Sequence, residues 1–297
     1  NSDKTDGFLK NSKPLAKGDF SGGFLNAGVS ELTMACIMNG LALHGGVIPV
    51  CGTFFVFSDY MKPAFRMSAL MRLQVIYVWS HDAFRVGEDG PTHQPIEQEL
   101  QVRLMESLKN HKGKNSMLVL RPADESETTV AWQMALENTD SPTGLILSRQ
   151  NIKSLPRPAD RYADALNMKK GAYVVKNVEK PDVILLASGS EVATLFEAAN
   201  LLEDKKNLKV KIVSVPSEGV YFTQSESYRS TVIDYNIPIF GLTAGLPMTL
   251  QRIAGLKGRV FGLDHFGHSA PYNVLDEKFG FTAENIYNQV CDYLANY

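Results

Sequence analysis

Short apolar segments with the character of buried strands alternate with segments of helical periodicity along most of this chain. The run VIYVW at residues 75–79 is typical of a strand covered on both faces, and residues 183–187 (VILLA) share its character. Between such runs, apolar residues recur at helical spacing. This spacing predicts a helix over residues 125–137, for example, which Asp124 is suited to cap. Strands that alternate with helices predict mostly parallel sheets with helices on both faces, so we expect an α/β fold.

The chain is long enough for two domains, because 297 residues can bury two separate cores. The alternation is interrupted at residues 150–182, where prolines and charged residues accumulate. We therefore predict two three-layer α/β domains, over residues 1–155 and 182–297. A connection over residues 156–181 joins them, with an edge hairpin at residues 172–178.

Composition excludes several classes of protein. The chain has 30 basic and 32 acidic residues, a net charge of −2, which provides no electrostatic footprint for nucleic acid or an anionic membrane surface. No apolar run approaches the roughly 18 residues that a membrane span needs. Three cysteines form no disulfide or zinc framework, so we expect a cytoplasmic protein. The chain opens at Asn1 without a methionine, and we expect it to be a piece of a longer protein.

Two segments carry candidate binding residues near the start of the first domain. Glu31 is an acid at the opening of an otherwise apolar helix, where it either complements the helix dipole or acts as a buried carboxylate that hydrogen-bonds a ligand. Phe54, Phe57 and Tyr60 recur at a spacing that suits either core packing or a slot for a flat heterocycle.

The polar loop at residues 80–95 follows the predicted strand 75–79, at the end where open α/β sheets bind ligands. It contains His81, Asp89 and His93, but no compact metal-ligand spacing, so we predict no metal site in this chain. Arg149, just past another predicted strand, suits a bidentate phosphate contact or a surface salt bridge. The turn at residues 188–190 (SGS) is a weaker phosphate-binding candidate.

Taken together, these segments resemble the transketolase family. The resemblance is carried by motifs in family order over nearly the whole chain. They are GVSELTMACIMNGLALHGG (28–46), GTFFVFSDY (52–60), SHDAFRVGEDGPTHQP (80–95), LRPADESET (120–128), LILSRQN (145–151), SGSEV (188–192) and FGHSAPYNVLDEKFGFTAENI (266–286). GEDGPTHQP (87–95) separates transketolase from related thiamine-dependent enzymes. The resemblance implies a pyrimidine-binding domain followed by the family's C-terminal domain.

The resemblance also implies a transferase that uses thiamine diphosphate. Such an enzyme moves a two-carbon ketol (glycolaldehyde) unit reversibly from a ketose phosphate to an aldose phosphate, in the pentose phosphate pathway. Glu31 matches the glutamate that hydrogen-bonds the aminopyrimidine ring of the cofactor, and Phe57 matches the aromatic residue that stacks on that ring. Phe54 and Tyr60 complete this pocket.

The substrate-binding residues carried over by the resemblance are His81, Asp89, His93, Arg149 and Ser2. Arg149 and His81 hold the sugar phosphate, Asp89 accepts a hydrogen bond from a substrate hydroxyl, and His93 shuttles protons near the reacting carbons. Ser2 matches a serine that contacts phosphate. The sequence also departs from the family at Arg85, where a small residue is usual, and this change is expected to alter the mouth of the substrate channel.

The family's amino-terminal domain, which binds the diphosphate and its Mg²⁺ or Ca²⁺, has no counterpart in these 297 residues. In the family, the active site lies between that domain and the pyrimidine domain of the other subunit of a homodimer. We therefore expect the chain to hold half a site and to be inactive without the amino-terminal portion. The alternatives are the small subunit of a split transketolase, a related deoxyxylulose phosphate synthase, and a non-catalytic interaction protein of the same fold.

Overall fold

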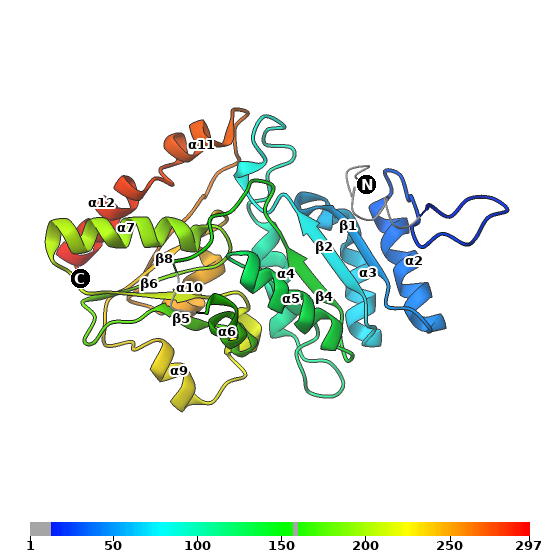
Figure 1. The fold of residues 1–297 in the computed structure, drawn as a ribbon, viewed down its shortest axis with the longest axis horizontal. Helices are drawn as coiled ribbons and strands as arrows, with labels where there is room; N and C mark the ends of the chain where they lie inside the picture. The colour runs from blue at the N-terminus through cyan, green and yellow to red at the C-terminus, as the bar shows by residue number, and fades with distance from the viewer. Residues whose placement is uncertain (1–12, 157–159) are drawn as a thin grey trace.

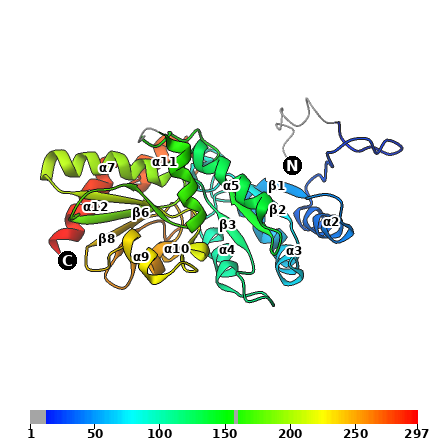
Figure 2. The same ribbon diagram turned by 60° about the horizontal axis from the view of Figure 1, so that its bottom comes forward.

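Two β-sheets with flanking helices lie side by side in the computed structural model, which describes residues 13–156 and 160–297 (Figure 1). The N-terminal sheet and the C-terminal sheet occupy opposite ends of the molecule, and the turned view in Figure 2 keeps this separation. The predicted α/β class with mostly parallel sheets is confirmed. No helix in the described residues is both long and apolar enough to cross a membrane.

The first sheet has four strands in the order β1-β2-β4-β3, all parallel. Its strands are β1 (Val50–Phe54), β2 (Ile76–Ser80), β3 (Leu118–Leu120) and β4 (Thr143–Ile146). Val47, Ile48 and Pro49 precede β1, whose first pairing joins Val50 with Ile76. The parallel arrangement places the carboxyl ends of β1, β2 and β4 along one edge.

Side chains that alternate along these strands supply a separate core on each face of the first sheet. Tyr77 and Trp79 of β2 pack with residues of α2, α3 and α4, whereas Ile76 packs with α5 and the segment after it. The helices are α2 (Glu31–His44), α3 (Ser58–Met71), α4 (Gln98–Ser107), α5 (Glu125–Glu137) and α6 (Arg161–Ala165). The capping role predicted for Asp124 is confirmed, because its side chain accepts a hydrogen bond from the backbone N–H of Glu127 at 2.9 Å.

The second sheet has the order β5-β7-β6-β8-β9 and is parallel except for β5. Its strands are β5 (Tyr173–Lys176), β6 (Val183–Ala187), β7 (Val210–Ser214), β8 (Ile239–Leu242) and β9 (Arg259–Phe261). The edge hairpin expected at residues 172–178 is instead the single strand β5, antiparallel to β7. The domain boundaries at residues 155 and 182 stay a prediction.

Helices cover both faces of the second sheet as well. Residues of α7, α11 and α12 pack on one face in a single core, and residues around α9 and α10 pack on the other. The helices of this half are α7 (Glu191–Lys206), α8 (Glu218–Tyr221), α9 (Glu226–Val232), α10 (Met248–Ala254), α11 (Tyr272–Phe279) and α12 (Ala283–Ala295). The core against α7 also contains Ala83 and Phe84, which belong to the loop after β2. The loop from the first half is therefore packed into the second half.

Candidate active site at the carboxyl edge of the first sheet

The candidate residues of the first half gather where β1, β2 and β4 end. Phe54 is the last residue of β1 and pairs in register with Ser80, the last residue of β2. His81 follows Ser80 directly, and Arg149 lies three residues past the end of β4, the other neighbour of β2. Parallel pairing thus explains why segments separated by about a hundred residues meet at one edge of the sheet.

Five aromatic rings form a continuous group at this edge. The Phe54 ring stacks on the His81 ring with centroids 3.5 Å apart, and it lies 6.1 Å from the Phe57 ring at an interplanar angle of 14°. Tyr60 continues the group, 5.9 Å from Phe57, and is 62% exposed. His93 stands edge-on to Phe54 and Phe57 at 6.2 and 5.4 Å. Three aromatic and two histidine candidates are therefore brought together.

The environment of His81 keeps its imidazole neutral at pH 7. Partial burial is the largest cause, and together with the charges of Arg149 and His93 it lowers the pKa of His81 to about 4, against the opposing charge of Asp89. His81 Nδ1 lies 2.9 Å from the Ser80 hydroxyl oxygen, and His93 Nδ1 lies 2.8 Å from that of Thr92. His81 can therefore hydrogen-bond a phosphate, but it does not add a positive charge to the site.

Glu31 is buried beside the aromatic group. It is the first residue of α2 and 7% exposed, and its Oε1 accepts a hydrogen bond from the Thr53 hydroxyl at 3.3 Å. Thr53 directly precedes Phe54 on β1, so the carboxylate lies next to the ring that opens the group. Burial favours the ligand-binding interpretation of Glu31 over that of an exposed residue that only complements the helix dipole.

The remaining candidates lie at the rim. Asp89 is exposed between Gly87 and Gly90, whose φ angles of +89° and +75° turn the loop tightly around it. Arg149 is exposed as well. Ser2 lies outside the described residues. Neither the described ranges 13–156 nor 160–297 contain three or more His, Cys, Asp or Glu side chains arranged to hold a metal.

Arg85 does not present its guanidinium to solvent: it is 5% exposed, and its guanidinium donates to Glu191 and Asp276 at 2.8 Å each. The expected effect of Arg85 on a channel mouth stays a prediction, whereas the phosphate-binding role expected for residues 188–190 was wrong. The turn at residues 188–190 does not offer room for a phosphate, because the Arg121 guanidinium fills it. A Cβ at Gly189 would lie 2.8 Å from the Arg121 guanidinium carbon, and Arg121 Nη1 donates to the Ser188 carbonyl at 3.0 Å.

Thr53 and Gln94 are parts of this region that the sequence did not single out. Thr53 holds Glu31, and Gln94 donates from its amide to the carbonyls of Gly87 and His268 at 3.1 and 2.9 Å. The alternation of side chains along β1 indicates which face of the sheet Thr53 occupies. The His268 carbonyl that accepts a hydrogen bond from Gln94 belongs to a loop 174 residues away, and no local sequence pattern reveals this contact.

Comparisons with known proteins agree with this organisation. The family described as the transketolase pyrimidine-binding domain matches residues 2–154, and the one described as the transketolase-like C-terminal domain matches residues 171–282. Transketolase 2 of Vibrio parahaemolyticus is 43% identical over 286 residues, 96% of this chain and 41% of that protein. A Staphylococcus aureus transketolase is 44% identical over 265 residues, 89% of this chain and 38% of that protein. The chain thus spans about two fifths of the length of these relatives.

Solved structures of transketolases share the fold. The Leishmania mexicana enzyme superposes with a TM-score of 0.84 at 34% identity, over 96% of this chain and 40% of that one. A chain described as a split gene transketolase, inactive beta4 tetramer, has a TM-score of 0.69 at 22% identity, over 92% of this chain and 84% of that one, and it shows a likeness of fold alone. The chain belongs to the transketolase family.

Proposed function

We propose that this chain supplies the pyrimidine-binding half of a thiamine diphosphate site in a transketolase. The observation that carries the proposal is the buried Glu31 carboxylate next to a partly exposed group of aromatic rings and two histidines at the carboxyl edge of the sheet. The reaction is the reversible transfer of a two-carbon ketol unit from a ketose phosphate to an aldose phosphate. When bound, the cofactor supplies the electron sink for cleavage of the carbon–carbon bond.

The residues present fit the pyrimidine ring of this cofactor. Phe57 lies between Phe54 and Tyr60 with interplanar angles of 14° and 26°, so the three rings offer flat apolar surface for stacking. Glu31 can hydrogen-bond a ring nitrogen from its buried position, and the hydrogen bond from Thr53 orients its carboxylate. With the cofactor bound, Glu31 would thereby act on the protonation of the ring from a side chain that is itself only 7% exposed.

The exposed rim suits a sugar phosphate. The Arg149 guanidinium can hold a phosphate through two parallel hydrogen bonds. Neutral His81 can donate one more hydrogen bond to the phosphate without adding a positive charge. The Asp89 carboxylate can accept a hydrogen bond from a sugar hydroxyl. His93, edge-on to Phe54 and Phe57, is placed to hold or pass a proton close to the stacked ring.

The diphosphate half of the site is proposed to come from a different polypeptide segment, which also holds Mg²⁺ or Ca²⁺. The matched families are the pyrimidine-binding and C-terminal ones, which supports this division. Apolar side chains on and around α2 are open to solvent, with Val29 89%, Leu43 62% and Val47 58% exposed, and exposed apolar side chains favour association. We propose assembly as a homodimer of the complete enzyme or as a split enzyme, in the cytoplasm, and no turnover by this chain alone.

Reconstitution with site variants tests this proposal. The chain is mixed with a polypeptide that carries the amino-terminal part of a transketolase relative, and ketol transfer and cofactor affinity are measured. We expect Glu31→Gln to lower kcat by about 10²–10⁴-fold and Phe57→Ala to weaken cofactor binding by about tenfold. Tyr162→Ala, at an exposed aromatic residue on α6, is the matched control and should change neither. An active assembly in which Glu31→Gln and Phe57→Ala behave like wild type would refute the proposed site.

A further inference from the structure

The loop that carries His81, Asp89 and His93 is held by the C-terminal half of the molecule. Phe84 of this loop has no exposed surface and belongs to the core of the second sheet. Its ring centroid lies 5.2 Å from that of Phe279, the last residue of α11, and 4.8 Å from that of Phe281. A loop between β2 and α4 is thus packed by rings that occur about 200 residues later.

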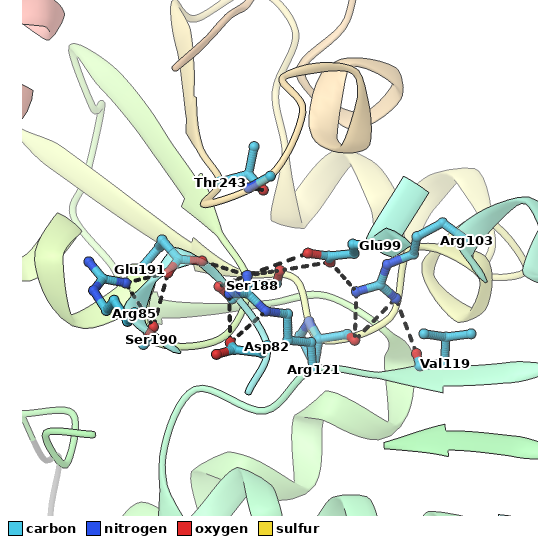
Figure 3. Close-up of polar contacts among 12 residues, drawn as sticks. Asp82, Arg85, Glu99, Arg103, Val119, Arg121, Ser188, Ser190, Glu191 and Thr243 are labelled. Carbon is cyan, nitrogen blue, oxygen red and sulfur yellow. Dashed lines mark hydrogen bonds and ion pairs between the residues drawn. The ribbon is translucent and has the colours of Figure 1, made fainter. Parts of the chain in front are cut away.

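A chain of alternating charges fixes the same loop. We call Asp82, Arg121, Glu191, Arg85 and Asp276 the clamp. Arg121 Nη2 lies 2.8 Å from Asp82 Oδ2, and Arg121 Nη1 lies 2.5 Å from Glu191 Oε2. Arg85 Nη1 lies 2.8 Å from Glu191 Oε1, and Arg85 Nε lies 2.8 Å from Asp276 Oδ1. Figure 3 shows Glu191 between the two guanidinium groups. Because Asp82, Arg121 and Glu191 are almost fully buried, these contacts are weakly screened by water.

Uncharged contacts hold the far end of the loop. The Gln94 amide bridges the carbonyls of Gly87 and His268, and the Ser269 hydroxyl donates to the Glu88 carbonyl at 2.5 Å. Gly267 has no side chain where Gln94 packs, and a Cβ there would overlap the Gln94 side-chain oxygen. The loop is therefore attached to the second half at both ends.

His81 needs such support because its backbone is strained. Its φ of +61° lies in the left-handed region, which costs a non-glycine residue on the order of 1–3 kcal/mol. His81 directly precedes Asp82 of the clamp, and Arg85 lies between His81 and Asp89 in the chain. Release of the clamp would allow the backbone at His81 to relax and its ring to leave the stack on Phe54.

We propose that Arg85 is a positioning residue through which the C-terminal half sets the geometry of the loop that carries His81, Asp89 and His93. Arg85 acts through Glu191 and Asp276 and touches no reacting group. The importance of this geometry for sugar phosphate binding rests on the proposed function, whereas the restraint of His81 does not.

Titration of the histidine rings by NMR tests the proposal in the 297-residue chain, without cofactor, sugar or partner. In the wild type, His81 should titrate near a pKa of about 4, because partial burial and the neighbouring charges of Arg149 and His93 disfavour its protonated form. Arg85→Gln should raise the pKa of His81 by about one unit or more, toward its ordinary value, because the ring becomes exposed. His44 is the last residue of α2 and His111 follows α4, so both lie outside the loop in the chain, and their ring signals serve as internal references.

A second variant separates positioning from direct electrostatics. Arg85→Gln removes a positive charge, which by itself also raises the pKa of a histidine. Asp276→Asn removes a negative charge, which by itself lowers that pKa, yet it frees Arg85 from α11. Positioning predicts that Asp276→Asn raises the pKa of His81 as well, by a smaller amount.

The control is Arg259→Gln, which breaks an exposed ion pair with Asp292 and should leave His81 unchanged. If Arg85→Gln does not fold, Asp276→Asn decides the question. An unchanged or lowered pKa of His81 in folded Asp276→Asn overturns the proposal, as does an unchanged pKa in folded Arg85→Gln. Because the titration involves no turnover, a chain that fails to support ketol transfer leaves this result intact.

Discussion

Replacement of Arg121 by methionine is expected to destabilise the chain strongly. Arg121 is fully buried, pairs with Asp82 at 2.8 Å and Glu191 at 2.5 Å, and lies 3.6 Å from Glu99. Methionine keeps much of the length of the side chain but removes its charge, so Glu191 keeps only Arg85 as a cationic partner and Asp82 has lost its ion pair. Removal of one partner from a buried ion pair costs about 3–5 kcal/mol. We expect a loss of this size in the free energy of unfolding.

Urea denaturation of the wild type and Arg121→Met, followed by circular dichroism, measures this loss. Arg259→Met is the matched control: its ion pair with Asp292 is exposed, and its loss should cost about 0–1 kcal/mol. In the wild type, the charges of Arg121 and Arg85 outweigh burial and lower the pKa of Glu191. Without Arg121, burial raises that pKa, so the variant should recover part of its stability at pH 5 relative to pH 8. A loss in Arg121→Met no larger than that in Arg259→Met would contradict the expected role of the buried Arg121 ion pairs.

Two further substitutions test packing and burial. In urea denaturation, Gly144→Ala should destabilise the chain by about 1–3 kcal/mol, because the new Cβ would lie 2.5 Å from the buried Trp79 ring. Gly40→Ala should stabilise the chain by about 1 kcal/mol, because Gly40 lies within helix α2 and a Cβ there meets nothing within 4 Å. Equal effects of the two substitutions would contradict these expectations. Burial raises the pKa of Glu218 to about 7, so its protonated form favours folding below about pH 4.5 and this contribution is lost as the pH rises through 7. Glu218→Gln should therefore exceed the wild type in stability by about 1–3 kcal/mol at pH 8 and lose that advantage at pH 5, and parallel stability curves would argue against a buried Glu218.

Local patterns predicted most of the fold. The strand at residues 183–187 and the α5 helix at residues 125–137 have the predicted bounds, because a run of buried apolar residues and a capping aspartate are both encoded locally. The short helices α8, α9 and α10 were not predicted, since four to seven residues carry too little periodicity. Strand β5 was read as a hairpin because its partner, β7, lies more than 30 residues later in the sequence.

Part of the candidate site could likewise be predicted from local patterns, and part depends on contacts between residues far apart in the sequence. Parallel strands bring Phe54 and His81 to one edge, so candidates drawn from the segments after those strands do meet in space. The buried position of Arg85 could not be predicted, because its partners Glu191 and Asp276 are 106 and 191 residues away. A charged residue in a polar loop is expected to be exposed. Only the tertiary fold brings together the two carboxylates that pair with the buried guanidinium.

Ketol transfer by the chain alone and after addition of the amino-terminal part of a transketolase relative is the most direct test of the half-site. Both mixtures contain thiamine diphosphate and Mg²⁺, and product formation from a ketose phosphate and an aldose phosphate is followed. We expect no turnover by the chain alone and turnover once the second polypeptide is bound. Turnover by the 297-residue chain alone, or an inactive assembly in which both polypeptides are folded and associated, would contradict it.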